Sequence, residues 1–376
     1  MTSDVAQQLA SLPQETRDRL RSYGFDPDWF LRHVERMRGK GRADNIVRGK
    51  VEPPRPDDIV ELPPSGSEER ARLEEKGLEV MSEGGCAIVV LAGGMATRMG
   101  GVVKALVEAL PGRSFLDLRL AGHRAMEERV GQSLPFWLMT SHATDEAIRA
   151  ALGDRLDGYH IATFPQMVSL RLDPDGSLFL DDEGLPSHHS PGHGDLPEAL
   201  QRSGLLDEFI SRGGRYVTTA NLDNIGATLD PALVGMQVET GAALMCEIAD
   251  KEGTDRGGIP ARLDGRPLIL EELRIPESFD PAQVRVFNTN TFHFEAGALR
   301  DLEMEWTYFV VEKEVDGRPA IQFERIINEV AAHLDSVFVH VPRQGPESRF
   351  LPVKDDEALA ARRPLLAEVA AQRGMI

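Results

Sequence analysis

Short apolar runs alternate with amphipathic stretches through the middle of the chain. The runs at 87–91, 135–141 and 216–219 consist mainly of apolar and β-branched residues, which is typical of strands buried on both faces. A helical pattern follows the second run, starting at Thr144. This alternation predicts an α/β fold with a mixed, mainly parallel sheet flanked by helices.

The first part of the chain predicts a helical leader. Helical spacing covers 3–22, 27–38 and 67–82, and Gly84-Gly85 is suited to end the last of these helices. Five prolines lie between residues 53 and 64, so we expect residues 45–66 to be extended along the surface. We divide the chain into three parts: residues 1–82 as a helical leader packing on the core, 83–345 as the core, and 346–376 as a closing block.

The second half of the chain predicts strands and hairpins. Residues 170–189 resemble a hairpin-like excursion over the edge of the sheet. Further hairpins are predicted with turns at Asp264-Gly265 and Asp316-Gly317. The remaining expected elements are strands at 241–248, 285–294 and 336–341, an amphipathic helix at 323–333, and a closing helix at 355–372.

The residues best suited to bind a charged ligand lie where the run at 87–91 meets a glycine turn. Gly93 and Gly94 lack a Cβ, so successive N–H groups can surround an anion, and Arg98 and Lys104 add positive charge. The spacing fits neither a P-loop nor a dinucleotide-binding fingerprint, and the glycines could also serve turn geometry alone. With both cations nearby, the segment predicts a site for a nucleoside triphosphate.

Asp223 follows the strand at 216–219 and is a second candidate site residue. An aspartate here can form a turn or cap a helix. It can also bind Mg²⁺, which takes one or two carboxylates and fills its other positions with water and phosphate oxygens. Zinc held by His188, His189 and His193 is disfavoured, because no paired cysteines complete a tetrahedral set.

The charge and the cysteine content narrow the possible partners. The 376 residues carry a net charge of -19, which opposes binding to nucleic acid or anionic lipid. Only Cys86 and Cys246 are present, so a disulfide framework is not expected. Without a secretory signal pattern or a membrane-length apolar stretch, the sequence predicts a cytoplasmic protein that binds neither nucleic acid nor membranes.

Five separated motifs together resemble one family. They are similar to blocks of the UTP-dependent sugar-1-phosphate uridylyltransferases, and within these to UTP–glucose-1-phosphate uridylyltransferase (UDP-glucose pyrophosphorylase). The resemblance covers roughly residues 65–360. The motifs are Leu91-Ala92-Gly93-Gly94 with Thr97-Arg98, Pro191-Gly192-His193-Gly194-Asp195, Ala220-Asn221-Leu222-Asp223-Asn224, Phe287-Asn288-Thr289-Asn290, and Ser348-Arg349-Phe350-Leu351-Pro352-Val353-Lys354, with Lys104 as the lysine that follows the first.

This resemblance implies a Rossmann-like nucleotidyltransferase core and a reaction. A sugar 1-phosphate, most simply glucose 1-phosphate, attacks the α-phosphorus of UTP in line and gives UDP-glucose and pyrophosphate, with Mg²⁺ as cofactor. Eukaryotic relatives carry a C-terminal β-helix used in assembly, for which this chain has no room, so we expect a monomer. The implied contacts are Leu91, Ala92, Gly93, Gly94, Gln166 and Gly192 with UTP; Arg98, Lys104 and Lys354 with the reacting phosphates; Asp223 with Mg²⁺; and His193, Asn221, Glu271 and Asn290 with the sugar phosphate.

Some residues leave the substrate and the chemistry open. The family commonly has glycine at the position of Ala96 and proline at that of Val103. Gln166-Met167 is nearer to the N-acetylhexosamine branch, whereas the motif around His193 is nearer to the glucose branch. The alternatives are therefore a UDP-N-acetylglucosamine or broad UDP-sugar pyrophosphorylase, or a sugar-nucleotide binding protein without catalysis.

Overall fold

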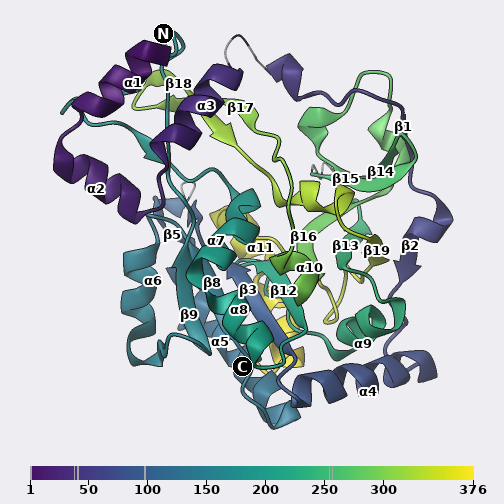
Figure 1. The fold of residues 1–376 in the computed structure, drawn as a ribbon. Coiled ribbons are helices and arrows are strands. Elements are labelled where there is room, and N and C mark those ends of the chain that lie inside the picture. The colour runs from purple at the N-terminus through teal and green to yellow at the C-terminus, as the bar shows by residue number, and fades with distance from the viewer. Residues whose placement is uncertain (1, 38, 40–41, 97–98, 254, 256) are drawn as a thin grey trace.

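A central eight-stranded sheet organises the molecule (Figure 1). The computed structural model describes residues 2–37, 39, 42–96, 99–253, 255 and 257–376. In spatial order the strands of the sheet are β2 (Ile59–Glu61), β19 (Ser336–His340), β13 (Leu244–Asp250), β16 (Val286–Glu295), β12 (Tyr216–Asn221), β3 (Cys86–Leu91), β8 (Phe136–Thr140) and β9 (Ile161–Pro165).

The sheet is mixed and mainly parallel, as the sequence predicts. Strands β12, β3, β8 and β9 pair in parallel on one side, and β13, β19 and β2 do so on the other. Only β16 is antiparallel to its two neighbours in this sheet, β12 and β13. The beginning of β16 therefore lies at the same edge of the sheet as the carboxyl ends of the other strands.

Helices cover both faces, because successive side chains of a strand point to opposite sides. In β3, Ala87 and Val89 belong to one hydrophobic cluster, and Ile88 and Val90 belong to another. Helices contributing to the first are α1 (Thr2–Ser11), α2 (Gln14–Ser22), α3 (Pro27–Met37), α7 (Leu196–Ser203), α8 (Leu205–Ser211) and α10 (Ala296–Arg300). Those contributing to the second include α4 (Glu68–Ser82), α5 (Phe115–Val130), α6 (Asp145–Leu152), α9 (Pro231–Thr240) and α11 (Asp356–Gln372).

Small two- and three-stranded sheets surround the central one. Both hairpins with Asp-Gly turns are confirmed, and Asp264 and Asp316 have the positive φ values of 49° and 52° that such tight turns require. The excursion at 170–189 is also a hairpin-like segment. The pairs are β4 (Met95–Ala96) with β5 (Val102–Val103), β6 (Glu108–Leu110) with β7 (Arg113–Ser114), β10 (Ser169–Leu170) with β11 (His188–His189), β17 (Phe309–Val315) with β18 (Arg318–Glu324), and β1 (Val51–Glu52) with β14 (Ile259–Leu263), which in turn pairs with β15 (Arg266–Leu270).

The proline-rich segment at 45–66 is largely extended, as predicted, but parts of it join sheets. Strand β1 pairs with β14, and β2 forms an edge of the central sheet beside β19. The division of the chain at residues 82 and 345 remains a prediction.

The predicted amphipathic helix at 323–333 is wrong. Phe323 and Glu324 complete β18, and only a 3-10 helix forms over Ile327–Ala332. The polar side chains of that segment are used in tertiary contacts. Glu329 accepts a hydrogen bond from the Thr307 backbone N–H at 2.9 Å and pairs with Arg274. These contacts outweigh the local helical periodicity, which is a weak determinant by itself.

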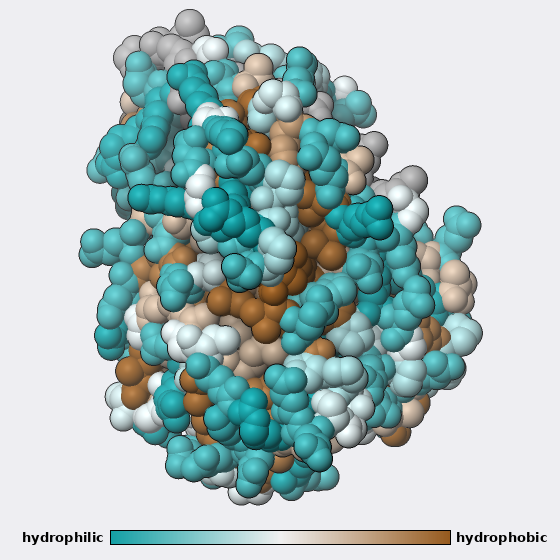
Figure 2. Space-filling view, turned by 90° about the vertical axis from the view of Figure 1, so that its right-hand side faces the viewer, coloured by the Kyte–Doolittle hydropathy of each residue, from teal (hydrophilic) through white to brown (hydrophobic). Residues whose placement is uncertain are grey.

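The face of the molecule in Figure 2 is mainly hydrophilic, with a hollow near its middle where apolar side chains are visible. A largely polar surface agrees with the strong net charge of the sequence. Within the described residues, no helix combines the length and apolarity needed to cross a membrane.

Helices α4 and α9 pack with their backbones in close approach. A Cβ at Gly77 would overlap the carbonyl oxygen of Pro231, and a Cβ at Gly235 would overlap that of Leu73. Both glycines are buried. Glycine thus serves here to bring two helices together, although it is a poor helix former.

We expect Gly77→Ala to destabilise the protein by about 1–3 kcal/mol, because the added methyl must push the helices apart. Alanine is the better helix former by about 1 kcal/mol, so propensity alone predicts a gain. The reverse exchange on the exposed side of α4, Ala71→Gly, should cost about 1 kcal/mol through propensity only. Urea unfolding of both variants measures this, and a stabilised Gly77→Ala protein would contradict the close packing.

Candidate active site

A cavity of about 580 Å³ lies at the carboxyl ends of the central strands. It brings together residues from across the predicted motifs. Arg98 lies outside the described residues. All other residues predicted for the site line the cavity: Leu91, Ala92, Gly93, Gly94, Lys104, Gln166, Gly192, His193, Asn221, Asp223, Glu271, Asn290 and Lys354.

Strand pairing explains why the glycine turn and the Asp223 loop meet. In the parallel pair of β3 and β12, Leu91 lies opposite Asn221, so both strands end at the same level. Ser141, just after β8, donates a hydrogen bond from Oγ to the Gly93 carbonyl oxygen at 2.9 Å. These strands therefore end at one edge of the sheet, the place where ligands of such sheets collect.

Gly93 is needed for the close approach of Gln166. A Cβ at Gly93 would overlap the Gln166 side-chain amide, whereas a Cβ at Gly94 would meet no described atom within 4 Å beyond its own chain neighbours. Gln166 is buried, and its Oε1 accepts no hydrogen bond within the described part of the chain. A buried acceptor of this kind requires a donor, which a ligand in the cavity can supply.

Lys104 and Asp223 form an ion pair, with 2.7 Å between Lys104 Nζ and Asp223 Oδ2. The same oxygen accepts the Val353 backbone N–H at 3.1 Å. The family differences at Ala96 and Val103 fall in the small β4–β5 hairpin, which leads directly to Lys104. Lys104 thus reaches Asp223 with alanine at 96 and valine at 103.

The Asp223 site suits a hard divalent cation. Its carboxylate lies at a strand end beside the glycine turn and beside Lys104, where a phosphate chain would bring further oxygen ligands. Among the described residues, no three His, Cys, Asp or Glu side chains gather around a common point. A cation at Asp223 would therefore take most of its ligands from phosphate and water, as Mg²⁺ usually does.

His193 is held as a neutral hydrogen-bond donor facing the cavity. The Ile327 backbone N–H donates to Nδ1 at 3.2 Å, so the ring proton belongs on Nε2. Burial lowers the pKa of His193 to about 4. The neighbouring glycines permit this placement, because a Cβ at Gly192 or Gly194 would approach the Arg325 backbone to 2.8 or 2.7 Å.

A bulge in β16 delivers Asn290 to the cavity. The register of β13 and β16 shifts between Cys246 and Ile248, and Asn290 there has a left-handed backbone with φ of 60°. Its Nδ2 donates to Asn221 Oδ1 at 2.9 Å. Bulges beside sites commonly redirect a side chain in this way.

Glu271 belongs to a polar chain that sequence reasoning only partly found. Asn328 Nδ2 donates to Glu271 Oε1, and Asn288 Nδ2 donates to Asn328 Oδ1 at 3.0 Å. Burial raises the pKa of Glu271 to about 7. Asn328 was missed because it falls inside the segment predicted as a helix, whereas Asn288 belongs to a recognised motif.

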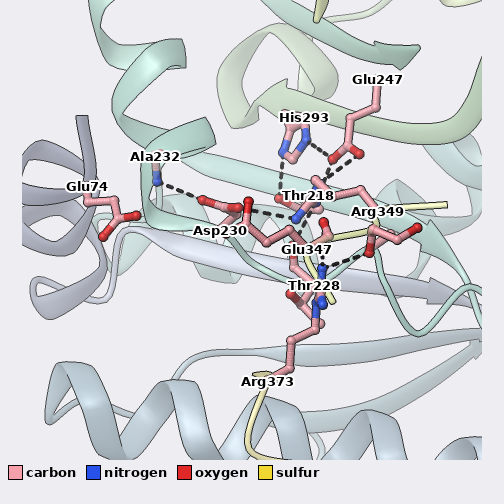
Figure 3. A network of polar contacts seen from close by, with 12 residues as sticks. Glu74, Thr218, Thr228, Asp230, Ala232, Glu247, His293, Glu347, Arg349 and Arg373 are labelled. Atoms are coloured by element: carbon pink, nitrogen blue, oxygen red, sulfur yellow. Dashed lines mark hydrogen bonds and ion pairs between the residues drawn. The ribbon is translucent and has the colours of Figure 1, made fainter. Parts of the chain in front are cut away.

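Lys354 is exposed. The segment before it is held by buried charged groups at Arg349, Glu247 and His293 (Figure 3). Glu247 accepts from Arg349 Nη2 at 2.6 Å and Nε at 2.9 Å, and from His293 Nε2 at 2.8 Å. Burial, the largest single effect, raises the pKa of Glu247, but the charges and hydrogen bonds of Arg349 and His293 together outweigh it and lower the pKa to about 2. The Glu247–Arg349 pair thus anchors the segment that leads to Lys354.

A family model described as UTP–glucose-1-phosphate uridylyltransferase matches residues 28–372. The chain belongs to this family. It is 29% identical over 378 residues to a probable UTP–glucose-1-phosphate uridylyltransferase of Schizosaccharomyces pombe, covering 94% of this chain and 72% of that protein. It is also 29% identical to the UTP–glucose-1-phosphate uridylyltransferase of Saccharomyces cerevisiae, covering 84% of this chain and 65% of the yeast protein.

Solved structures show the same fold. A UDP-N-acetylglucosamine pyrophosphorylase of Trypanosoma brucei in complex with an inhibitor aligns with a TM-score of 0.76 at 20% identity, covering 95% of this chain and 80% of that one. A UDP-glucose pyrophosphorylase mutant of Leishmania major with UDP-glucose aligns with a TM-score of 0.73 at 23% identity, covering 95% of this chain and 78% of that one. The predicted nucleotidyltransferase fold is confirmed.

The raised pKa of Glu271 predicts how stability depends on pH. Between the usual value of 4.5 and about 7, the folded protein keeps a proton that the unfolded chain has released. The free energy of unfolding of the unaltered protein, measured relative to that of Glu271→Gln, should therefore fall by about 1–3 kcal/mol as pH rises from about 4.5 to 7. Above pH 7 this difference should stay constant. Urea unfolding across this range measures the difference. Glu277→Gln, at an exposed carboxylate, should show no such trend, and a pH-independent difference for Glu271→Gln would contradict the assignment.

Proposed function

We propose that this protein transfers UMP from UTP to a sugar 1-phosphate, with glucose 1-phosphate as the preferred acceptor, and releases pyrophosphate. The observation that carries the proposal is the gathering of the motif residues in one cavity, where the Lys104–Asp223 pair lies beside the glycine turn. Membership of the uridylyltransferase family supports the same reaction.

In this proposal, the glycine turn and Gln166 hold the uridine. The Gln166 amide has one acceptor edge and one donor edge, and uracil offers a matching N–H and carbonyl. The Oε1 of Gln166 is buried without a protein donor in the described residues, which favours a ligand that donates there. Gly192 lines the same cavity, and in this proposal it contacts the base.

The phosphates react between two lysines. Lys104 holds the triphosphate from the side of the glycine turn, and Lys354 approaches from the opposite segment, which Val353 ties to Asp223. Bound Mg²⁺ at Asp223 supplies charge neutralisation for the phosphate oxygens. The sugar phosphate then attacks the α-phosphorus in line, so the protein contributes alignment and positive charge rather than covalent chemistry.

The sugar side is polar and largely neutral. His193 Nε2, Asn221 and Asn290 offer donors and acceptors to hydroxyl groups, and Glu271 offers a carboxyl whose pKa of about 7 allows either role near neutral pH. The neutral His193 donates without adding charge. The glucose preference rests on the resemblance of the His193 motif to the glucose branch and on the names of the relatives.

Lys354→Ala and Asp223→Ala should each lower kcat/KM about 100- to 1,000-fold, the usual loss when one group that stabilises transition-state charge is removed. Lys313→Ala, a charge change on the β17–β18 hairpin that does not line the cavity, is the matched control and should leave turnover unchanged. Thermal unfolding verifies that all three variants fold. Turnover retained by either site variant would contradict its assigned role.

The reaction itself is tested by pyrophosphate release from UTP and Mg²⁺ with three acceptors in parallel. Glucose 1-phosphate should react faster than galactose 1-phosphate and N-acetylglucosamine 1-phosphate, because the acceptor side follows the glucose branch. A preference for N-acetylglucosamine 1-phosphate would overturn the substrate assignment. If no acceptor releases pyrophosphate while UDP-glucose still binds in calorimetry, the transferase proposal fails in favour of a binding protein.

A further inference from the structure

A single buried arginine on α5 holds the loop that carries two of the site residues. Arg119 is 2% exposed. It donates from Nε to the Leu222 carbonyl oxygen at 3.1 Å and from Nη1 to that of Ala227 at 2.5 Å. Its Nη2 donates to the carbonyl oxygens of Asn224, at 2.6 Å, and Asn221. All four acceptors lie within residues 221–227, the last residue of β12 and the loop that follows it.

This arrangement makes the loop depend on one guanidinium. Four carbonyl dipoles converge on one point, where they repel one another unless a cation lies between them. Only a planar fork with five N–H groups can serve so many acceptors from one side chain. Within the described residues, no carboxylate lies at ion-pair distance from Arg119. Burial lowers the pKa of Arg119 to about 9, and the negative charge of Asp223 partly offsets this effect.

The same loop is hydrogen-bonded to residues 349–353, the segment that leads to Lys354. Asn224 Nδ2 donates to the Arg349 carbonyl oxygen at 2.9 Å, and its Oδ1 accepts from the Leu351 N–H at 2.9 Å. Asp223 accepts from the Val353 N–H. A shift of the loop would therefore move Asn221, Asp223 and the backbone before Lys354 together.

We propose that Arg119 is a positioning residue for this site: it sets the place of Asn221 and of the metal-binding carboxylate of Asp223 through the carbonyl groups of their loop, without touching substrate. The role in turnover rests on the transferase reaction proposed above. The effect of Arg119 on the position of the loop does not rest on that reaction, because it is present in the protein without substrate.

A second cavity makes this proposal testable by chemical rescue. Arg119 lines a cavity of about 310 Å³ on the side of α5, together with Gly122 and Met126 of the same helix and the chain from Thr228 to Pro231. Removing the side chain in Arg119→Ala extends this space toward the four carbonyl groups. A free guanidinium ion can then occupy the vacated position and donate to the same oxygens.

We expect Arg119→Ala to lower kcat/KM about 100-fold and to raise the Mg²⁺ concentration needed for half-maximal activity. Guanidinium at about 20 mM, far below the molar range in which it unfolds proteins, should restore at least a tenth of the lost activity, whereas equal urea or sodium chloride should not. Arg119→Lys keeps the charge but not the planar guanidinium, so it should fold even if Arg119→Ala does not. Its loss of kcat/KM should be intermediate, and the Mg²⁺ concentration needed for half-maximal activity should rise in the same direction.

A control variant distinguishes a general loss of stability from a loss of loop positioning, because it should destabilise the protein by a similar amount. Ile148→Ala removes a fully buried side chain of α6 that does not line the site cavity, so it should lower the melting temperature without changing the Mg²⁺ dependence or responding to guanidinium. Unchanged Mg²⁺ dependence in Arg119→Lys would overturn the positioning role, and so would a loss of activity in a folded Arg119→Ala protein that guanidinium does not restore.

Hydrogen exchange of the substrate-free protein gives a reading that is independent of turnover. Peptides covering 221–227 and 349–354 should exchange faster in Arg119→Lys than in the unaltered protein, while those of α6 should not. If the unaltered protein shows no transferase activity but these peptides respond, the proposed reaction fails and the loop-positioning effect stands. If activity is present and the peptides are unaffected, the positioning proposal fails.

Discussion

The parallel pairing of β3 with β12 is the constraint on which the rest of the site depends. The register places Leu91 opposite Asn221, so a glycine turn and an acidic loop leave the sheet side by side. The apolar side chains of β3 are buried on both faces, and a one-residue slip would exchange the two sets. The burial that stabilises the sheet therefore also determines which polar residues meet at its edge.

Buried arginines hold the loops that this pairing brings together. Arg119 binds the carbonyl groups of the 221–227 loop, and Arg349 ties the segment before Lys354 to Glu247. Arg325, which is fully buried, pairs with Asp195 and lies directly behind the Gly192–Gly194 turn. A guanidinium is suited to this work because it carries several donors in a rigid plane and stays charged when buried.

Much of the architecture was predictable from local pattern. Buried strands, Asp-Gly hairpins and the closing helix have strong local determinants, namely apolar runs, positive-φ turn residues and helical periodicity. The segment at 323–333 was mispredicted because Asn328 and Glu329 are bound by partners distant in the sequence, Glu271 and Arg274. Periodicity carries no information about such partners.

The residue types needed for the site were also readable from the sequence, mostly through resemblance of separated motifs to one family. By itself the sequence determined the order of the strands and helices, the glycine turn with its cations, and the carboxylate at a strand end, because these follow from side-chain chemistry over a few neighbouring residues. Only the tertiary structure decided that β16 runs antiparallel, that a bulge turns Asn290 toward Asn221, and that Arg119 lies beneath the Asp223 loop. These features depend on contacts between segments far apart in the chain, whose geometry is set only when the sheet and its two helical layers pack together.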